Sequence, residues 1–202
     1  MPFDIIPLEP RHWNRVRAIY LEGLATGRAG FETRAPEWAE WDITHLPHSR
    51  MVAVATAEGQ GERLEAPGGS PHADRDRDPA SEPESRDSNG EGRIVGWIAL
   101  STVSDRQCYA GVAEVSVYVA GEAWGRGVGT LLLNEAVRTS EAAGVWTLQA
   151  AIFPENSRSV RLHSTCGFRI VGRRERIARR DGVWHDTLLM ERRSRVVGRE
   201  SG

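Results

Sequence analysis

One unit of the sequence restricts the possible folds more than any other: an alternating strand, a glycine-rich turn and an amphipathic helix that follow one another. In Val112 to Ala120, polar side chains alternate strictly with apolar ones, a pattern typical of a strand with one buried face. The turn occupies Gly125 to Gly129, and Gly144 ends the helix Thr130 to Ala143 as a C-cap. This order predicts a domain that contains both α and β structure.

The glycine-rich turn is also a candidate for binding an anion. Glycines let a backbone approach a ligand closely, and the following helix offers free N–H groups and a partial positive charge, which suit a phosphate. The dinucleotide fingerprint GxGxxG fails because residue 130 is Thr, and a P-loop is excluded because the chain has no Lys. Taken alone, Gly127 and Gly129 have a second interpretation, in which they serve only the steric needs of a strand-to-helix turn.

Composition excludes several classes of protein. All 26 basic residues are Arg, so no lysine can form a Schiff base. The two Cys, Cys108 and Cys166, form no CxxC pair, which favours a cytoplasmic protein without a disulfide framework. We expect no membrane span and no nucleic-acid partner, because long apolar runs are absent and the net charge is −2. His45 and His48 lack a third ligand, so we expect no metal.

The chain is predicted to form one domain, residues 1–193, followed by a flexible tail at 194–202. The domain is interrupted at 58–92, where ten acidic and four basic residues accompany only one large apolar residue, Leu64. Such a segment cannot bury enough surface to offset its ordering entropy. We therefore expect a disordered acidic insertion there.

Hydrophobic periodicity predicts the elements on either side of this insertion. We expect strands at Phe3 to Leu8, Met51 to Ala55, Arg93 to Ser101 and Trp146 to Phe153, helices at Pro10 to Leu24, Pro36 to Leu46 and Ser157 to Cys166, and a closing hairpin of Phe168 to Ile177 with Trp184 to Arg192. The second and third strands should form a hairpin whose loop is the insertion. The closing hairpin should turn at Asp181-Gly182.

Two segments have the order of two motifs in a known superfamily. Residues 124–129, Trp-Gly-Arg-Gly-Val-Gly, and residues 156–168, Asn-Ser-Arg-Ser-Val-Arg-Leu-His-Ser-Thr-Cys-Gly-Phe, resemble motifs of the GNAT superfamily of acyl-CoA-dependent N-acetyltransferases. Within it the chain is most similar to the phosphinothricin acetyltransferase family, on residues 30–33, 114–119 and 182–186. The resemblance implies an α+β GNAT fold, with a mixed, mainly antiparallel sheet splayed near its middle and flanked by helices. It also implies a homodimer.

The resemblance further implies which residues bind the cosubstrate acetyl-CoA. Strand backbone would bind the pantetheine arm, the glycine loop would bind the pyrophosphate, and two residues of the later motif would add contacts. These residues are Ser116, Val117, Tyr118 and Val119; Trp124, Gly125, Arg126, Gly127, Val128 and Gly129; and Asn156 and Ser159. Trp124 stands where the superfamily usually has Gln or Arg, so the backbone cradle would carry that contact.

Glu114 is the candidate general base. An ammonium has no lone pair, so a carboxylate must take its proton before the amine attacks the thioester. Glu114 shares a strand face with Tyr118 and matches the family's catalytic Glu. Its alternative interpretation is a structural carboxylate in a cross-strand pair. His163 stands where many relatives carry a Tyr, and it either protonates the departing thiolate or only packs.

The acceptor implied by the resemblance is a small amino-acid-like amine such as phosphinothricin, methionine sulfone or methionine sulfoximine. Arg106, Tyr109 and Tyr118 would bind it and Phe31 would cover it. Ser104 replaces a Lys of phosphinothricin-specific members. Two alternatives stay open: another amine, such as a protein N-terminus or an antibiotic, or a non-catalytic acyl-CoA-binding sensor.

Overall fold

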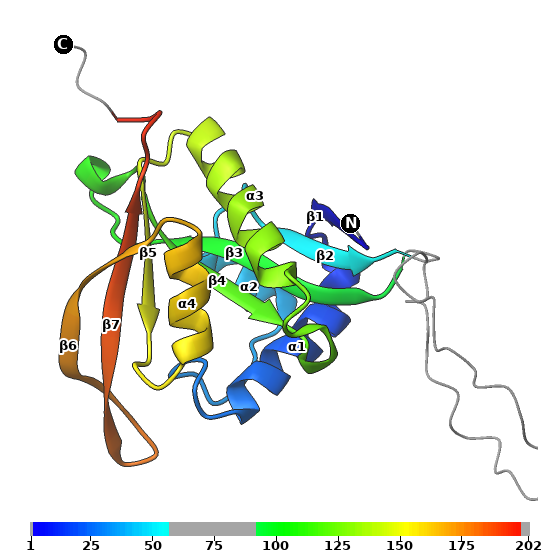
Figure 1. Ribbon diagram of the computed structural model, residues 1–202, viewed down its shortest axis with the longest axis horizontal. Helices are drawn as coiled ribbons and strands as arrows, with labels where there is room; N and C mark the ends of the chain where they lie inside the picture. The colour runs from blue at the N-terminus through cyan, green and yellow to red at the C-terminus, as the bar shows by residue number, and fades with distance from the viewer. Residues whose placement is uncertain (1, 57–91, 199–202) are drawn as a thin grey trace, which may run out of the picture.

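The computed structural model describes residues 2–56 and 92–198. The predicted insertion, apart from Gly92, and residues 199–202 of the predicted tail lie outside the described residues. Seven strands form one sheet in the order β1-β2-β3-β4-β5-β7-β6 (Figure 1). Their bounds are β1 Phe3–Pro7, β2 Met51–Ala55, β3 Ile94–Thr102, β4 Val112–Val119, β5 Thr147–Ile152, β6 Arg169–Arg180 and β7 Val183–Arg193.

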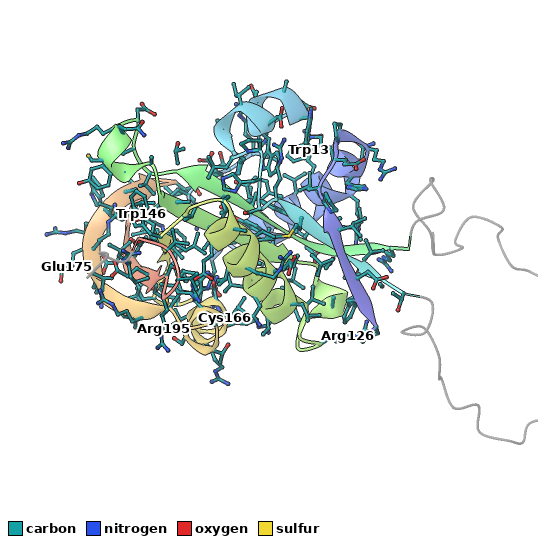
Figure 2. All side chains as sticks on the ribbon, turned by 90° about the horizontal axis from the view of Figure 1, so that it is seen from above. Trp13, Arg126, Trp146, Cys166, Glu175 and Arg195 are labelled. Carbon is teal, nitrogen blue, oxygen red and sulfur yellow. The ribbon has the colours of Figure 1, made fainter. Side chains whose placement is uncertain are left out.

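Helices cover both faces of this sheet. They are α1 Trp13–Ala25, α2 Trp38–Thr44, α3 Val128–Ala142 and α4 Ser157–Thr165, with 3-10 turns η1 Pro10–His12, η3 Gln107–Tyr109 and η4 Gly121–Ala123. Figure 2 shows Trp13 of α1 on one side of the sheet and Cys166, which follows α4, on the other. Each side has its own apolar core, one built on α1 and α2 and the other on α3 and α4. Within the described ranges, none of the helices is long and apolar enough to span a membrane.

The strand–turn–helix unit forms as predicted, with one shift of a boundary. Helix α3 begins at Val128, two residues before the predicted start at Thr130, because Gly127 is its N-cap and the Gly127 carbonyl accepts a hydrogen bond from the N–H of Leu131 at 3.0 Å. Val128 is 1% exposed and packs in the core. Gly144 follows the helix with a φ of 86°, the left-handed conformation expected of a C-terminal glycine.

Two other predicted bounds are also corrected. Helix α2 is shorter than Pro36 to Leu46, because a capping box on Glu37 starts it later and the N–H of Leu46 donates to the Leu100 carbonyl of β3 at 2.7 Å. The closing hairpin does turn at Asp181-Gly182, where both residues have positive φ. Its first strand runs to Arg180, past the predicted end at Ile177, because an irregularity in the pairing near Arg176 does not end the strand.

The sheet is splayed between β4 and β5, which confirms the expected fold. These two strands are parallel, whereas the other neighbouring pairs of the described sheet are antiparallel. Their pairing covers only Val112–Glu114 with Thr147–Gln149, whereas β4 pairs with β3 as far as Val119. In the described part of the chain, no strand therefore pairs with the β5-facing edge of Val115–Val119. We call this gap the β4–β5 opening.

Candidate active site

Glu114 lies where the β4–β5 opening begins. It is the last residue of β4 that pairs with β5, opposite Gln149, and it is half-buried. The Gln149 side chain donates from Nε2 to Oε2 of Glu114 at 3.1 Å. Glu114 is therefore in a cross-strand pair, as its structural interpretation requires, and among the described residues this bond engages only Oε2. The position leaves Oε1 available for a proton transfer, and the catalytic role stays a prediction.

The β4 residues beyond Glu114 provide backbone groups for an extended ligand. A strand paired on one edge only has N–H and C=O groups on its other edge, which can bind a second extended chain. Backbone groups alternate between the two edges of a strand, and the Ala120 N–H donates to the Val95 carbonyl of β3. Of the four residues predicted to bind the pantetheine arm, Ser116 and Tyr118 therefore pair with β3, while Val117 and Val119 present their backbone groups at the opening. The contact with the pantetheine arm stays a prediction. Side chains of β4 alternate here: Val117 and Val119 pack toward α3, whereas Tyr118 packs in the core on the α1 side.

The glycine turn places open space at the N-terminus of α3. Gly125 and Gly127 have φ of 76° and 84°, and a Cβ atom on either would meet nothing within 4 Å. No side chain caps the first turn of α3, so its N–H groups can bind an anion. Gly129 differs, because its Cβ would lie 2.9 Å from a methyl of Leu162. The steric interpretation therefore holds for Gly129, and the left-handed φ of Gly125 and Gly127 favours glycine there too. The open space at Gly125 and Gly127 also leaves room for a phosphate-bearing ligand.

Trp124 closes the turn instead of contacting a ligand with a polar side chain. Its indole Nε1 donates to the Val119 carbonyl at 2.8 Å, and the Arg158 guanidinium lies 4.1 Å from its ring centroid. Arg158 thus brings a cation from α4 to the glycine turn. Arg158 was not predicted as a site residue, because no local signal in the sequence indicates that α4 and the turn meet. The Arg126 guanidinium lies 4.9 Å from the centroid of the Phe3 ring.

Asn156 joins two segments of the chain. Its Oδ1 accepts a hydrogen bond from the Ser159 N–H at 3.1 Å and so caps α4, while its Nδ2 donates to the Arg28 carbonyl at 3.1 Å. Both ends of the amide are therefore used within the protein. The predicted cofactor contacts of Asn156 and Ser159 stay predictions.

His163 is buried in α4, with an exposed fraction of 2%. Its Nδ1–H donates to the Ser159 carbonyl at 2.9 Å, and its ring contacts Phe168 edge to face. Nε2 is buried without a partner among the described atoms. Burial lowers the pKa of His163 below its ordinary value. A neutral buried imidazole is a poor proton donor, so this geometry favours the packing alternative over the acid.

The lowered pKa of His163 predicts a pH-dependent stability. The unfolded His has a pKa of about 6.5, and the folded one is lower, so the unfolded state binds more protons below that pH. The stabilisation that the neutral, buried His163 gives the folded state is therefore fully present above pH ~6.5. It is lost as the pH falls through the pKa of His163 in the folded protein. We expect His163→Leu to reduce the decline in unfolding free energy between pH 7.5 and 5, as measured by urea denaturation.

A matched control uses an exposed position of the same helix. Ser164→Ala should keep the wild-type decline, and part of the decline should remain in His163→Leu because burial lowers the pKa of His45 and His48 too. A His163→Leu protein with the full wild-type decline contradicts the prediction.

The predicted acceptor residues lie in two separate groups. Phe31 packs in a cluster with Phe153, at a ring-centroid distance of 4.9 Å, and with His185 at 6.1 Å. Arg106 and Tyr109 lie on the exposed β3–β4 connection, with the Arg106 guanidinium 5.6 Å from the Tyr109 ring. Phe153 and His185 were not predicted as site residues. Their positions at the end of β5 and on β7 become significant only once the sheet order is known.

Concave surfaces also occur away from these residues. One cavity of about 490 Å³ lies between the end of α4, the start of β6 and the end of β7. Two of its arginines form ion pairs: Arg169 pairs with Glu191, and Arg192 pairs with Glu141. Over the described ranges, no three His, Cys, Asp or Glu residues are placed to hold a metal.

Comparisons with known proteins agree with this geometry. The profile of the Acetyltransferase (GNAT) family matches residues 64–168, more than half of the chain. The L-methionine sulfoximine/L-methionine sulfone acetyltransferase of Pseudomonas aeruginosa is 30% identical over 104 residues, which cover 52% of this chain and 60% of that protein. The phosphinothricin N-acetyltransferase of Alcaligenes faecalis is 29% identical over 179 residues, covering 88% of this chain and 75% of that protein.

A solved structure has the same fold. The crystal structure of a GNAT superfamily phosphinothricin acetyltransferase from Sinorhizobium meliloti in complex with AcCoA aligns with a TM-score of 0.71 at 24% identity. The alignment covers 100% of this chain and 95% of that one. The chain spans 60% to 62% of the length of the first curated relatives that it matches.

Proposed function

The chain belongs to the acetyltransferase (GNAT) family, and from that membership we propose that it transfers an acetyl group from acetyl-CoA to the amine of a small amino-acid-like molecule. The observation that carries the proposal is the position of Glu114. Its carboxylate lies at the start of the β4–β5 opening, next to the free backbone edge of β4 and on the strand that leads to the glycine turn. The candidate base lies on β4, the backbone edge for an extended ligand follows it on the same strand, and the candidate phosphate site is the glycine turn that comes after β4.

Each of these parts has a role in the proposed reaction. Acetyl-CoA supplies the acetyl group as an activated thioester. Gly125, Gly127 and the N-terminus of α3 would hold its pyrophosphate, and the edge from Ser116 to Val119 would hold its pantetheine arm. A backbone N–H of this edge would polarise the thioester carbonyl. Glu114 would take the proton of the acceptor ammonium, which frees the lone pair for attack on the thioester carbonyl. As the amide C–N bond forms, the thioester C–S bond would break and coenzyme A would leave as a thiolate, which the ordinary thiol pKa of about 8.5 permits without a dedicated acid.

The names of the relatives support an acceptor with an α-amine beside a carboxylate and a tetrahedral polar centre. Arg106 would bind an anionic group of such an acceptor and Tyr109 would flank it. The backbone N–H of Arg106 donates to the Ser104 hydroxyl at 3.3 Å, so residue 104 lies in the same turn as Arg106. Ser104 supplies no second positive charge.

The missing charge predicts an order of acceptors. We expect methionine sulfone and methionine sulfoximine to have higher kcat/KM than phosphinothricin, because the doubly anionic acceptor loses one charge partner worth roughly 1 to 3 kcal/mol. Ser104→Lys should narrow or reverse this difference, while Ser104→Ala, which removes the hydroxyl and adds no charge, should not. The measurement is release of free thiol from acetyl-CoA over a panel of amines.

Three outcomes of that panel are informative. Coenzyme A binding without thiol release from any amine would identify a non-catalytic sensor and overturn the proposal. Thiol release with only a peptide N-terminus or an antibiotic would show that the acceptor is that amine and not a small amino-acid-like molecule. A tenfold preference of the unaltered protein for phosphinothricin would refute the role given to residue 104.

We further propose that the protein acts as a cytoplasmic homodimer. Strand β6 is an edge strand, and apolar side chains lie exposed on it and on β7. These are Ile170, Val171, Ile177, Val183 and Trp184. Exposed edges with apolar side chains are commonly covered by a partner. The free thiols of Cys108 and Cys166 suit a reducing compartment.

A further inference from the structure

Side chains from three distant elements bind the backbone of one short segment, residues 27–30. The Arg180 guanidinium of β6 donates to the Gly27 carbonyl at 2.6 Å and to the Gly30 carbonyl at 2.7 Å. Between them, Asn156 Nδ2 donates to the Arg28 carbonyl at 3.1 Å, and the Tyr118 hydroxyl donates to the Ala29 carbonyl at 3.1 Å. Every carbonyl of this segment thus accepts a side-chain hydrogen bond, although residues 27–30 form no helix or strand.

Arg180 is used here as a donor to backbone rather than as an ion-pair partner. Its side chain is 15% exposed, and its ion pair with Asp181 is a long one, with 3.7 Å between Nε and a carboxylate oxygen of a side chain that is mostly exposed. The guanidinium also lies 5.6 Å from the centroid of the Phe153 ring. A half-buried cation held by two carbonyls fixes both of them, because the planar guanidinium presents its N–H groups in a rigid fork.

Tyr118 provides a rigid second anchor. Its ring stacks on Trp97 at a centroid distance of 4.9 Å, and burial raises the pKa of its phenol, so the hydroxyl stays protonated and donates. Asn156 is equally fixed, because its Oδ1 caps α4. The anchors belong to β4 on one side of the opening and to α4 and β6 on the other.

This arrangement determines where Phe31 lies. Phe31 directly follows the anchored segment and packs edge to face on Phe153, the residue after β5, with His185 of β7 stacked on the other ring at 5.1 Å. The segment therefore crosses from the Tyr118 side of the β4–β5 opening to the Phe153 side. A loop held at both sides keeps the Phe31 ring in one place, which reduces the ordering cost of ligand binding.

We propose that Arg180 and Asn156 are positioning residues for the acceptor: they hold the backbone of residues 27–30 so that Phe31 forms a fixed wall of the acceptor site. Neither residue touches the reacting atoms in this role. The inference rests on the proposed function for its kinetic consequence, but the anchoring itself is independent of any activity. It also gives Asn156 a role other than the predicted contact with acetyl-CoA.

The first test measures the anchoring without any turnover. Trypsin cleaves after Arg28, whose carbonyl is the one bound by Asn156, and Arg28 is exposed. We expect Arg180→Ala to accelerate this cut by roughly tenfold or more, because two hydrogen bonds from a charged donor are lost and the open form becomes more populated. Cleavage after Arg195, in an exposed segment away from the loop, is the internal reference. Arg174→Ala, an exposed position of the same strand, is the control variant.

Two conservative variants separate anchoring from stability. Asn156→Asp keeps an oxygen that caps α4 but has no donor for the Arg28 carbonyl, so it should accelerate the same cut while the thermal unfolding midpoint changes little. Arg180→Lys keeps the charge and one donor group, so it should recover part of the protection. Unchanged cleavage in both Arg180→Ala and Asn156→Asp overturns the anchoring.

The second test is kinetic. With the best amine of the panel, Arg180→Ala should raise KM for the acceptor about tenfold, with kcat and KM for acetyl-CoA changed less than about threefold. Faster cleavage together with an unchanged KM for the acceptor would overturn the role of Arg180 in positioning the acceptor. The hydrogen bonds that hold residues 27–30 would still be supported. If no amine is acetylated by the unaltered protein, the proposed function fails, and the proteolysis still decides whether residues 27–30 are held as described.

Discussion

Glu114→Gln should lower the turnover of acetyl transfer by roughly 10² to 10⁴-fold, the usual contribution of a general base. The substitution keeps the shape of the side chain, and its amide oxygen can still accept the hydrogen bond from Gln149 Nε2. It removes only the group that takes the proton. Initial rates of thiol release under saturating acetyl-CoA measure the loss, and calorimetry should give nearly unchanged affinity for coenzyme A.

The structural interpretation of Glu114 makes the opposite prediction. If the carboxylate served only as the cross-strand partner of Gln149, then Glu114→Gln, which keeps this hydrogen bond, would retain activity, and Gln149→Ala, which removes it, would be the more harmful change. We expect Gln149→Ala to retain most of the activity, because the base remains. We also expect the deficit of Glu114→Gln to shrink at high pH, where more of the acceptor amine is already neutral. Undiminished turnover in the Glu114→Gln protein would show that Glu114 is not the general base.

The strand–turn–helix unit could be predicted from sequence because its signals are local. Alternation in β4, the left-handed glycines of the turn and the glycine after α3 each depend on residues a few positions apart. The start of α3 was missed by two residues, because Val128 and Gly129 belong to the glycine motif as well as to the helix. A sequence pattern cannot locate the boundary between a turn and a helix when the same residues belong to both.

The anchored loop could not be predicted, because its partners are distant in the chain. Arg180 lies 150 positions from Gly30, and Asn156 lies 128 positions from Arg28. Arg180 ends an arginine-rich strand in which nothing local distinguishes it from Arg179, whose Nε bonds within its own hairpin turn. Only the fold, which brings β6 next to the end of α1, gives the two arginines different roles.

A substitution in the glycine turn should have a large effect on the affinity for coenzyme A. Gly127→Val should weaken the binding of coenzyme A at least tenfold, because a branched side chain would occupy the open space above the α3 N-terminus and would distort the left-handed N-cap residue. Calorimetric titration with coenzyme A measures the affinity. The difficulty is that a valine at a φ of 84° also strains the backbone, at a cost of about 1 to 3 kcal/mol in stability.

Helix α3 itself provides the control for that strain. Gly144, beyond the other end of the same helix, has a φ of 86°, and a Cβ atom there would also meet nothing within 4 Å. Gly144→Val should therefore lose a similar amount of unfolding free energy while keeping the affinity for coenzyme A. If both variants bind equally weakly, the effect is one of stability. If both bind as well as the unaltered protein, the phosphate does not lie at Gly127, and the cofactor must enter the opening without contacting the turn.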